Sequence, residues 1–150
     1  MKSFSLHIAT PERLVLSQEV VSVSIPTKDG QITVLPGHIP LITNVVNGEI
    51  VAKTAHDVLP MGVLGGFAKI TQDGVTILAD FAEHVHEMSE DVVQKAQAKA
   101  AELAAMKETL SKEDFEHFEA ELERSLMRVK VASKWKNMDA AVAKYNQSKQ

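Results

Sequence analysis

Cysteine is absent from the 150-residue chain, and so are long apolar runs. Without cysteine the protein has no disulfide, no thiol nucleophile and no cysteine-ligated metal, which fits a reducing compartment. No apolar stretch approaches the roughly 20 residues that a membrane-spanning helix needs. We therefore expect neither a disulfide scaffold nor a membrane-spanning helix.

Glycine and proline are missing from the second half of the chain. All seven glycines and all five prolines lie between Pro11 and Gly74. Because these residues are the strongest interruptions of regular structure, their distribution predicts two domains. We place a turn-rich domain at residues 1–88 and an uninterrupted one at residues 89–150.

An excess of basic residues is also lacking. Residues 1–88 hold 5 Lys and Arg against 9 Asp and Glu, and residues 89–150 hold 11 of each. A nucleic-acid-binding domain needs a basic excess. We therefore expect no nucleic acid among the partners.

No catalytic motif occurs in the chain. The sequence contains no GxxxxGK[ST] phosphate loop, no HExxH and no GxSxG. His84 and His86 flank Val85, but two imidazoles without further ligands nearby make a poor metal site. We predict no catalytic residue and no metal ligand.

Short strands with frequent turns are predicted in the first domain. Phe4, Leu6 and Ile8 alternate with polar residues, which is typical of a half-buried strand. The Gly65-Gly66 pair predicts a bulge or a close approach of two backbones. The pattern predicts an antiparallel β-sandwich, with further strands at 13–16, 21–25, 31–35, 41–46, 49–55, 58–63, 67–71 and 76–79.

Helical patterns replace the strands after Met88. Ser89 is a good N-cap for a helix at 90–109, and Ser111 with Asp114 forms an imperfect capping box for a second helix. Residues 137–150 either extend that second helix or fray. Two helices joined by a short turn pack antiparallel, so we predict an α+β protein in which an α-helical hairpin follows the sandwich. The expected facing sides are Val93, Ala96, Ala100 and Leu103 on the first helix, and Phe115, Phe118, Leu122, Ser125, Val129 and Ala132 on the second.

The most distinctive stretch is DGQITVLPGHIPL at residues 29–41. Asp29-Gly30 favours a tight two-residue hairpin turn, because glycine tolerates a positive φ. Pro36 and Gly37 then end the strand and hold His38 on a rigid loop.

This stretch resembles the epsilon subunit of the bacterial F-type ATP synthase. The motif PGHIPL is followed in family order by Asn47-Gly48-Glu49, by Gly65-Gly66-Phe67 and by VTILAD at residues 75–80. The resemblance covers nearly the whole chain. Thr33 stands where the family usually has glycine, and threonine suits a strand well.

The resemblance implies a non-catalytic rotor subunit that couples the gamma subunit to the c ring. It implies gamma contacts at His38 and Thr43, and c-ring contacts at Asp29, Gly30 and Gln31. It also implies that the helical hairpin inhibits ATP hydrolysis. Membrane association would come only through the complex, at the cytoplasmic face of the bacterial inner membrane.

Basic residues gather late in the second helix, at Arg124, Arg128, Lys130 and Lys134. One interpretation is a stable solvated helix, because cations near the carboxyl end complement the helix dipole. The other is a dock for an acidic surface on the alpha and beta subunits of the catalytic head. We favour the dock, given the resemblance.

Some members of the resembled family bind ATP through an [IL]DxxRA motif at the start of the first helix. Here residues 88–93 read MSEDVV, without the motif's Asp and Arg. Glu83, Arg124 and Arg128 do match positions that the family associates with nucleotide. We expect weak or absent ATP binding and no cofactor.

Two other hypotheses come from different classes. A generic adaptor would use the helical hairpin to dimerise as a four-helix bundle. A small hydrolase or isomerase would be built around His38 and Asp29, although no other residue completes such a site.

Overall fold

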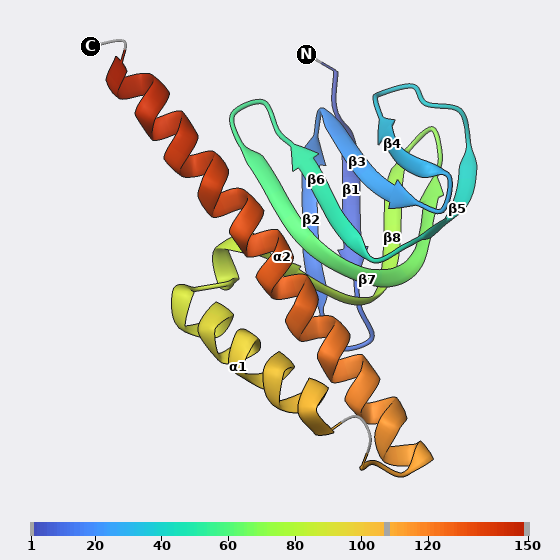
Figure 1. The fold of residues 1–150 in the computed structure, drawn as a ribbon. Helices are drawn as coiled ribbons and strands as arrows, with labels where there is room; N and C mark the ends of the chain where they lie inside the picture. Colours follow the sequence, from blue (N-terminus) through green and yellow to red (C-terminus); the bar gives the residue numbers. More distant parts are fainter. Residues whose placement is uncertain (1, 107–108, 149–150) are drawn as a thin grey trace. The chain divides into compact units, whose positions relative to one another are not determined.

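The computed structural model describes residues 2–106 and 109–148, with side chains described as far as residue 138. The chain divides into two compact units, Met1–Glu87 and Met88–Gln150. The described residues form eight strands, a short 3-10 helix and two α-helices (Figure 1). The strands are β1 (Phe4–Ala9), β2 (Leu14–Val20), β3 (Ser22–Thr27), β4 (Gly30–Val34), β5 (Leu41–Val45), β6 (Gly48–Lys53), β7 (Val58–Ile70) and β8 (Gly74–His84), and the helices are η1 (Val85–Glu87), α1 (Glu90–Met106) and α2 (Lys112–Ser148).

The predicted β-sandwich is confirmed as one continuous sheet that folds over into two layers. The strand order is β2-β1-β8-β7-β6-β3-β4, and β5 pairs with β7. The first half of β7 pairs with β6 and its second half with β5, so β7 passes from one layer to the other. Strands β1, β2 and β5 form one layer together with the adjoining halves of β7 and β8, and we call it the β1 layer. Strands β3, β4 and β6 form the other layer, which we call the β3 layer.

One strand pair is parallel rather than antiparallel. β1 pairs with β8 in parallel, from Ser5↔Gly74 to Ala9↔Leu78, and the other pairs that the described residues form are antiparallel. Alternation of apolar residues does not reveal this pair, because it reports which face a residue occupies and not the direction of the neighbouring strand.

The Gly65-Gly66 pair makes the close backbone approach that the sequence predicts. Their φ angles are +57° and +130°, and a Cβ built on Gly66 would lie 2.1 Å from the carbonyl oxygen of Leu78. The expectation of separate strands on either side of the pair was wrong. Glycine at positive φ bends β7 and lets it continue, so the two predicted strands are one.

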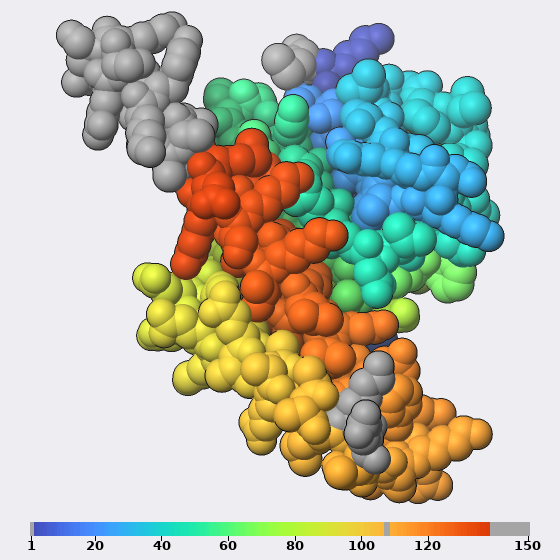
Figure 2. Space-filling view, viewed as in Figure 1, coloured from blue at the N-terminus to red at the C-terminus, as the bar shows by residue number. Residues whose placement is uncertain are grey.

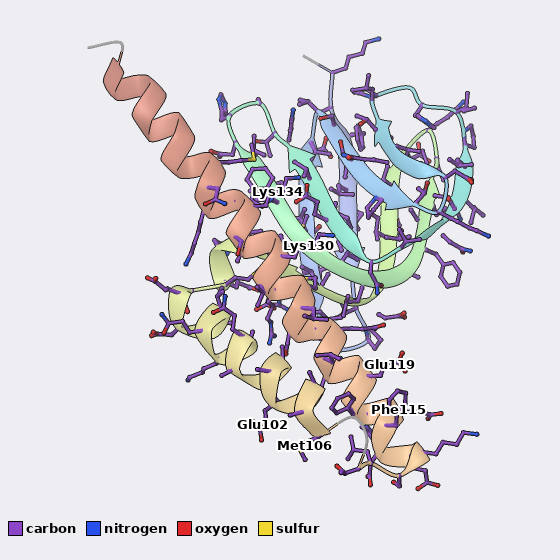
Figure 3. The ribbon with its side chains drawn as sticks, in the orientation of Figure 1. Glu102, Met106, Phe115, Glu119, Lys130 and Lys134 are labelled. Carbon is purple, nitrogen blue, oxygen red and sulfur yellow. The ribbon has the colours of Figure 1, made fainter. Side chains whose placement is uncertain are left out.

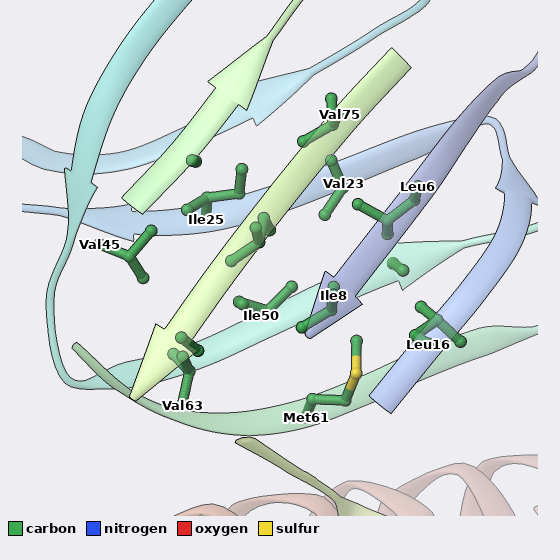
Figure 4. Packing of buried hydrophobic residues seen from close by; sticks show 14 of the residues in the cluster. Leu6, Ile8, Leu16, Val23, Ile25, Val45, Ile50, Met61, Val63 and Val75 are labelled. Carbon is green, nitrogen blue, oxygen red and sulfur yellow. The ribbon is translucent and has the colours of Figure 1, made fainter. Parts of the chain in front are cut away.

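The sandwich unit has a hydrophobic core of its own, to which all eight of the described strands contribute. Leu6, Ile8, Ile25 and Ile50 are completely buried, and Figure 4 shows them converging between the layers. Burying a side chain of this kind stabilises a fold by about 1.5–3 kcal/mol relative to leaving it exposed. The residues of this core run from Phe4 to Ala82, so the core lies within the first unit.

Both predicted N-caps are present. The Ser89 hydroxyl accepts a hydrogen bond from the Val92 N–H at 3.4 Å. The Ser111 hydroxyl accepts one from the Asp114 N–H at 3.3 Å and donates to its carboxylate at 2.7 Å. Helix α1 ends at Met106, whose carbonyl accepts from the N–H and hydroxyl of Thr109, so Thr109 lies in a turn and not in the helix as expected.

The helices of the second unit form the predicted antiparallel hairpin, but they differ in length. Helix α1 has 17 residues and α2 has 37, and an ion pair between Lys99 and Glu121 joins them. At 1.5 Å per residue these lengths are about 25 and 55 Å, so α2 extends past the start of α1 (Figure 1). Of residues 137–150, those up to Ser148 continue the helix, and the last two lie outside the described residues.

Candidate functional site

Large apolar side chains are exposed on the outer face of the β1 layer. Leu14, Ile42, Phe67 and Leu78 are 62%, 72%, 59% and 56% exposed. We call these four residues the apolar face. Clustered exposed apolar side chains of this kind mark protein interaction sites, whereas single ones are ordinary.

Strand register brings the apolar face together from four strands. Phe67 of β7 lies opposite Leu78 of β8, and Leu78 lies beside Ala9 of β1, which in turn pairs with Leu14 of β2. Directly opposed residues have Cβ atoms about 4.5–5.5 Å apart. Ile42 of β5 lies in the next row, opposite Lys69.

The apolar face was not predicted from the sequence, although one signal for it was present. In the VTILAD motif, Val75, Ile77 and Ala79 are buried, so alternation directs Leu78 outward. A leucine out of phase with the buried residues of its strand is a candidate contact. Phe67 gave no comparable signal, because the Gly65-Gly66 pair before it interrupts the alternation.

His38 lies in the loop between β4 and β5, after a tight turn. The His38 N–H donates to the Leu35 carbonyl at 3.1 Å, and Gly37 between them has a φ of +84°. Pro at the second position and glycine at the third are typical of a type II turn. The imidazole is half-buried and its Nδ1 donates to the Ile39 carbonyl at 2.7 Å.

The same loop exposes apolar side chains beside the histidine. Leu35 is 56% exposed and Ile39 is 75% exposed. Figure 2 shows this segment in cyan at the surface of the sandwich unit. The loop therefore offers aliphatic contacts at least as readily as the imidazole.

Thr43 occupies the opposite face of β5 from the apolar face. It pairs with Ala68, which is completely buried, and its side chain is half-buried. Its neighbours Ile42 and Asn44 point outward instead. Of the two expected gamma contacts, His38 lies on an exposed loop and Thr43 lies behind the exposed surface.

Asp29, Gly30 and Gln31 form the exposed tip of the β3–β4 hairpin. Thr27 pairs with Gly30, and its hydroxyl donates to the Gly30 carbonyl at 2.5 Å. The central residues of the turn are therefore Lys28 and Asp29, not the predicted Asp29-Gly30 pair. Among the described residues only glycines have positive φ, so Asp29 takes a type I turn with Gly30 after it.

The four basic residues of α2 fall into two pairs instead of forming one surface. Arg124 and Arg128 lie one turn apart, as do Lys130 and Lys134, which Figure 3 labels along the helix. At about 100° per residue, the lysine pair is rotated by about 120° from the arginine pair. The lysines are exposed and the arginines half-buried.

Hydrogen bonds join the end of β8 and the following helix η1 to the residues at the start of β2. The Arg13 guanidinium donates to both carboxylate oxygens of Glu87, at 3.1 and 2.8 Å, and His84 Nε2 donates to the Val15 carbonyl at 2.8 Å. The hydrogen bonds from Arg13 hold the pKa of Glu87 below its usual range. Because this pKa is lower in the folded chain, the pair stabilises the fold at neutral pH and stops doing so as the pH falls through the folded-state pKa.

His84 and His86, which lie near this point, make contacts within the fold. The rings of His84 and His86 are 4.8 Å apart, and His84 is engaged by the backbone of β2. In the part of the chain that the structure describes, no three His, Asp or Glu side chains are placed to hold a metal ion. The three residues that match nucleotide-associated positions are divided between the two units. Glu83 is buried in the first unit, whereas Arg124 and Arg128 belong to the second.

Comparison with known proteins identifies the family. A family model described as "ATP synthase, Delta/Epsilon chain, beta-sandwich domain" matches residues 3–85. The chain belongs to this family. The ATP synthase epsilon chain of Herpetosiphon aurantiacus is 38% identical over 132 residues, which cover 88% of this chain and 96% of that relative. The epsilon chain of Nitratidesulfovibrio vulgaris is 37% identical over 131 residues, with coverages of 87% and 96%.

Solved ATP synthases contain the same fold. A chain of the Euglena gracilis mitochondrial ATP synthase superposes with a TM-score of 0.63 at 21% identity, over 81% of this chain and 76% of that one. A chain in the central stalk and c-ring structure of the Tetrahymena thermophila enzyme gives 0.51 at 11%, over 60% and 72%.

Family membership settles the class of function. An epsilon chain is a structural and regulatory subunit of ATP synthase, so this protein is not a catalytic subunit. The hypothesis of a hydrolase built on His38 and Asp29 was therefore wrong. The protein belongs peripherally to a membrane complex, and none of its described helices is long and apolar enough to cross a bilayer.

Proposed function

We propose that the protein is a rotor subunit that joins the gamma subunit to the c ring of the ATP synthase. This proposal rests on the apolar face of the β1 layer, whose exposed side chains do not contribute to the core of the sandwich. A partner that covers Phe67 and Leu78 removes large apolar side chains from water, which is the main source of affinity at such interfaces. We assign this partner as gamma, with His38 at the edge of the contact.

The c ring binds elsewhere, at the tip of the β3–β4 hairpin. This tip belongs to the β3 layer, and its residues Asp29, Gly30 and Gln31 are exposed and carry no apolar side chain. Two contact surfaces of different chemistry on different layers suit a subunit that links two partners. Such a subunit transmits torque without chemistry of its own, at the cytoplasmic face of the bacterial inner membrane.

The helical hairpin regulates hydrolysis in this proposal. Helix α2 docks its basic residues on acidic surfaces of the alpha and beta subunits and blocks rotation in the hydrolytic direction. Residues 88–93 lack the Asp and Arg of the ATP-binding motif. We therefore propose that ATP binds weakly or not at all, and that the hairpin responds to conditions other than ATP.

The test is ATP hydrolysis by catalytic heads that contain gamma but lack this subunit. We expect the full chain to inhibit hydrolysis saturably, and a version ending at Met88 to bind equally well without inhibiting, because the sandwich has its own core. Binding is measured by co-sedimentation with the heads. If neither version binds, the rotor assignment is wrong, and a dimer of the full chain in sedimentation would instead support the adaptor hypothesis.

Charge reversal on α2 tests whether its basic residues bind an acidic surface of the catalytic head. We expect Lys130→Glu with Lys134→Glu to weaken inhibition by about tenfold or more, since like charges placed against an acidic surface cost several kcal/mol. The separate double variant Arg124→Glu with Arg128→Glu tests the other face of the helix. Inhibition is titrated as above.

The matched control for both double variants is Lys53→Glu with Lys95→Glu, which makes the same change in net charge outside α2. It should leave inhibition unaltered. Full inhibition by both α2 variants would contradict docking through either basic pair.

A further inference from the structure

We propose that a groove beside the apolar face receives an acidic side chain of the gamma subunit, and that His7 strengthens this contact as the pH falls. The groove lies between His7 of β1 and Lys69 of β7, with Thr76 of β8 between them, and we call it the basic groove. The inference rests on the proposed function in one respect, namely that gamma covers the apolar face. It adds the chemistry that gamma presents next to that face.

Strand register places the two basic side chains in one row across the sheet. His7 lies beside Thr76, and Thr76 lies opposite Lys69. All three are exposed, and the residues on either side of each along its strand are buried. Because neighbouring strands are about 4.8 Å apart, the backbones at His7 and Lys69 are about 10 Å apart. A carboxylate that enters the groove, whose volume is about 470 Å³, lies within reach of both side chains.

This row adjoins the apolar face. Thr76 lies two residues before Leu78 on β8, and Lys69 lies two residues after Phe67 on β7. At about 3.4 Å per residue, the two rows are about 7 Å apart. Ile42 of the apolar face lies directly opposite Lys69. A partner that covers the apolar face therefore brings its adjacent residues over the basic groove.

Both basic side chains are available to a partner. No ion pair with Lys69 forms among the residues that the structure describes. The Nδ1 atom of His7 shares a hydrogen bond with the Ser17 hydroxyl at 3.0 Å, which fixes the ring and leaves Nε2 for a partner. A carboxylate suits both groups, because hydrogen bonds between a cation and a carboxylate are stronger than neutral ones.

Two carboxylates of the chain lie near the groove, on the side away from the apolar face. Asp73 is in the turn before β8, about 10 Å along the chain from Thr76. Glu19 lies opposite Ser5, and its carboxylate accepts hydrogen bonds from the hydroxyls of Ser5 and Ser3. These hydrogen bonds hold the pKa of Glu19 below its usual range. The cations therefore lie between these carboxylates and the apolar face, and an acidic side chain of gamma fits there.

The attraction for an acid should grow as the pH falls. The groups that face His7 from the surrounding elements are Ser17 and Glu19 of β2, Thr76 of β8, Lys69 of β7 and Asp73 of the turn before β8. Carboxylates and lysines ordinarily keep their charge between about pH 6 and 8, whereas histidine gains a positive charge as the pH falls through this range. Protonation of His7 therefore adds positive charge to the groove and strengthens its contact with an acid.

The affinity for gamma-containing catalytic heads that lack this subunit tests the role of His7. We compare the ratio of the affinities at about pH 6 and about pH 8 between variants, so that titration of the heads themselves cancels. We expect this ratio to be about two- to five-fold larger for the unaltered chain than for His7→Gln, which is the range for one exposed ion pair. His56→Gln, at an exposed position in the turn between β6 and β7, is the matched control and should behave as the unaltered chain does.

Charge reversal tests the other side of the groove. We expect Lys69→Glu to weaken the affinity about tenfold at low salt, and less at high salt because exposed charges are screened. Lys53→Glu makes the same change in net charge on β6 of the β3 layer and should bind as the unaltered chain does. Thermal unfolding confirms that each variant is folded.

Carbodiimide coupling in the assembled complex identifies the acid. The reagent joins an amine to a carboxylate that lies against it, and mass spectrometry of the product shows which chains are joined. We expect a cross-link from Lys69 to an Asp or Glu of gamma. A cross-link from Lys69 to alpha, to beta or to a second copy of this chain would overturn the assignment of the acid to gamma.

Binding of Lys69→Glu as tight as that of Lys53→Glu, or an unchanged pH response in His7→Gln, would overturn the basic groove. The gamma assignment is judged separately, because it stands if the unaltered chain binds the heads and Phe67→Asp does not. An unaltered chain that does not bind the heads would overturn both.

Discussion

Replacement of Phe67 by aspartate is expected to weaken binding of the full chain to gamma-containing catalytic heads by about 100-fold. Phe67 is 59% exposed and lies opposite Leu78 in the apolar face. An aromatic side chain at such a position is a typical hot spot, whose loss costs about 2–4 kcal/mol. Aspartate adds the cost of burying an unpaired charge against the partner.

The affinity is measured by titration of heads that lack the subunit. Val58→Asp is the matched control, because Val58 is 48% exposed on the same strand but pairs with Lys53 of the β3 layer. It should bind as the unaltered chain does. Equal binding by both variants, with thermal unfolding showing both folded, would exclude the apolar face as the gamma contact.

Replacement of Gly66 by alanine is expected to destabilise the protein by about 3 kcal/mol or more, from backbone strain and overpacking together. The φ of Gly66 is +130°, and an added Cβ would lie 2.1 Å from the Leu78 carbonyl oxygen and 2.7 Å from the Ala79 Cα. Both neighbours are backbone atoms of β8 and cannot swing aside. The strand pair that carries Phe67 and Leu78 would have to separate.

Urea unfolding of the full chain measures this cost, with Gly30→Ala as the control. Gly30 also has a positive φ, +114°, but an added Cβ would meet no heavy atom within 4 Å. Its replacement should cost only the strain, about 1–2 kcal/mol. A Gly66→Ala variant no less stable than Gly30→Ala would show that the close approach of β7 and β8 does not constrain the fold.

Much of the candidate site lay beyond prediction from the sequence. The apolar face joins Leu14, Ile42, Phe67 and Leu78 from four strands, and only the register of the folded sheet makes them neighbours. Thr43, which stays a predicted gamma contact, is half-buried on the face of β5 opposite the apolar face. The division of the basic residues of α2 into two pairs, by contrast, follows from the helical period and could have been read from their spacing.

The sequence by itself determined the two-part organisation, most strands, both helix N-caps and the family. These features depend on interactions within a few residues, such as the alternation of Phe4, Leu6 and Ile8 or the serine hydroxyls of Ser89 and Ser111. Only the tertiary structure decided the parallel pairing of β1 with β8, the passage of β7 between layers and the ion pair of Arg13 with Glu87. Each of these joins segments far apart in the chain, and local propensity carries no information about which distant segment will become a neighbour.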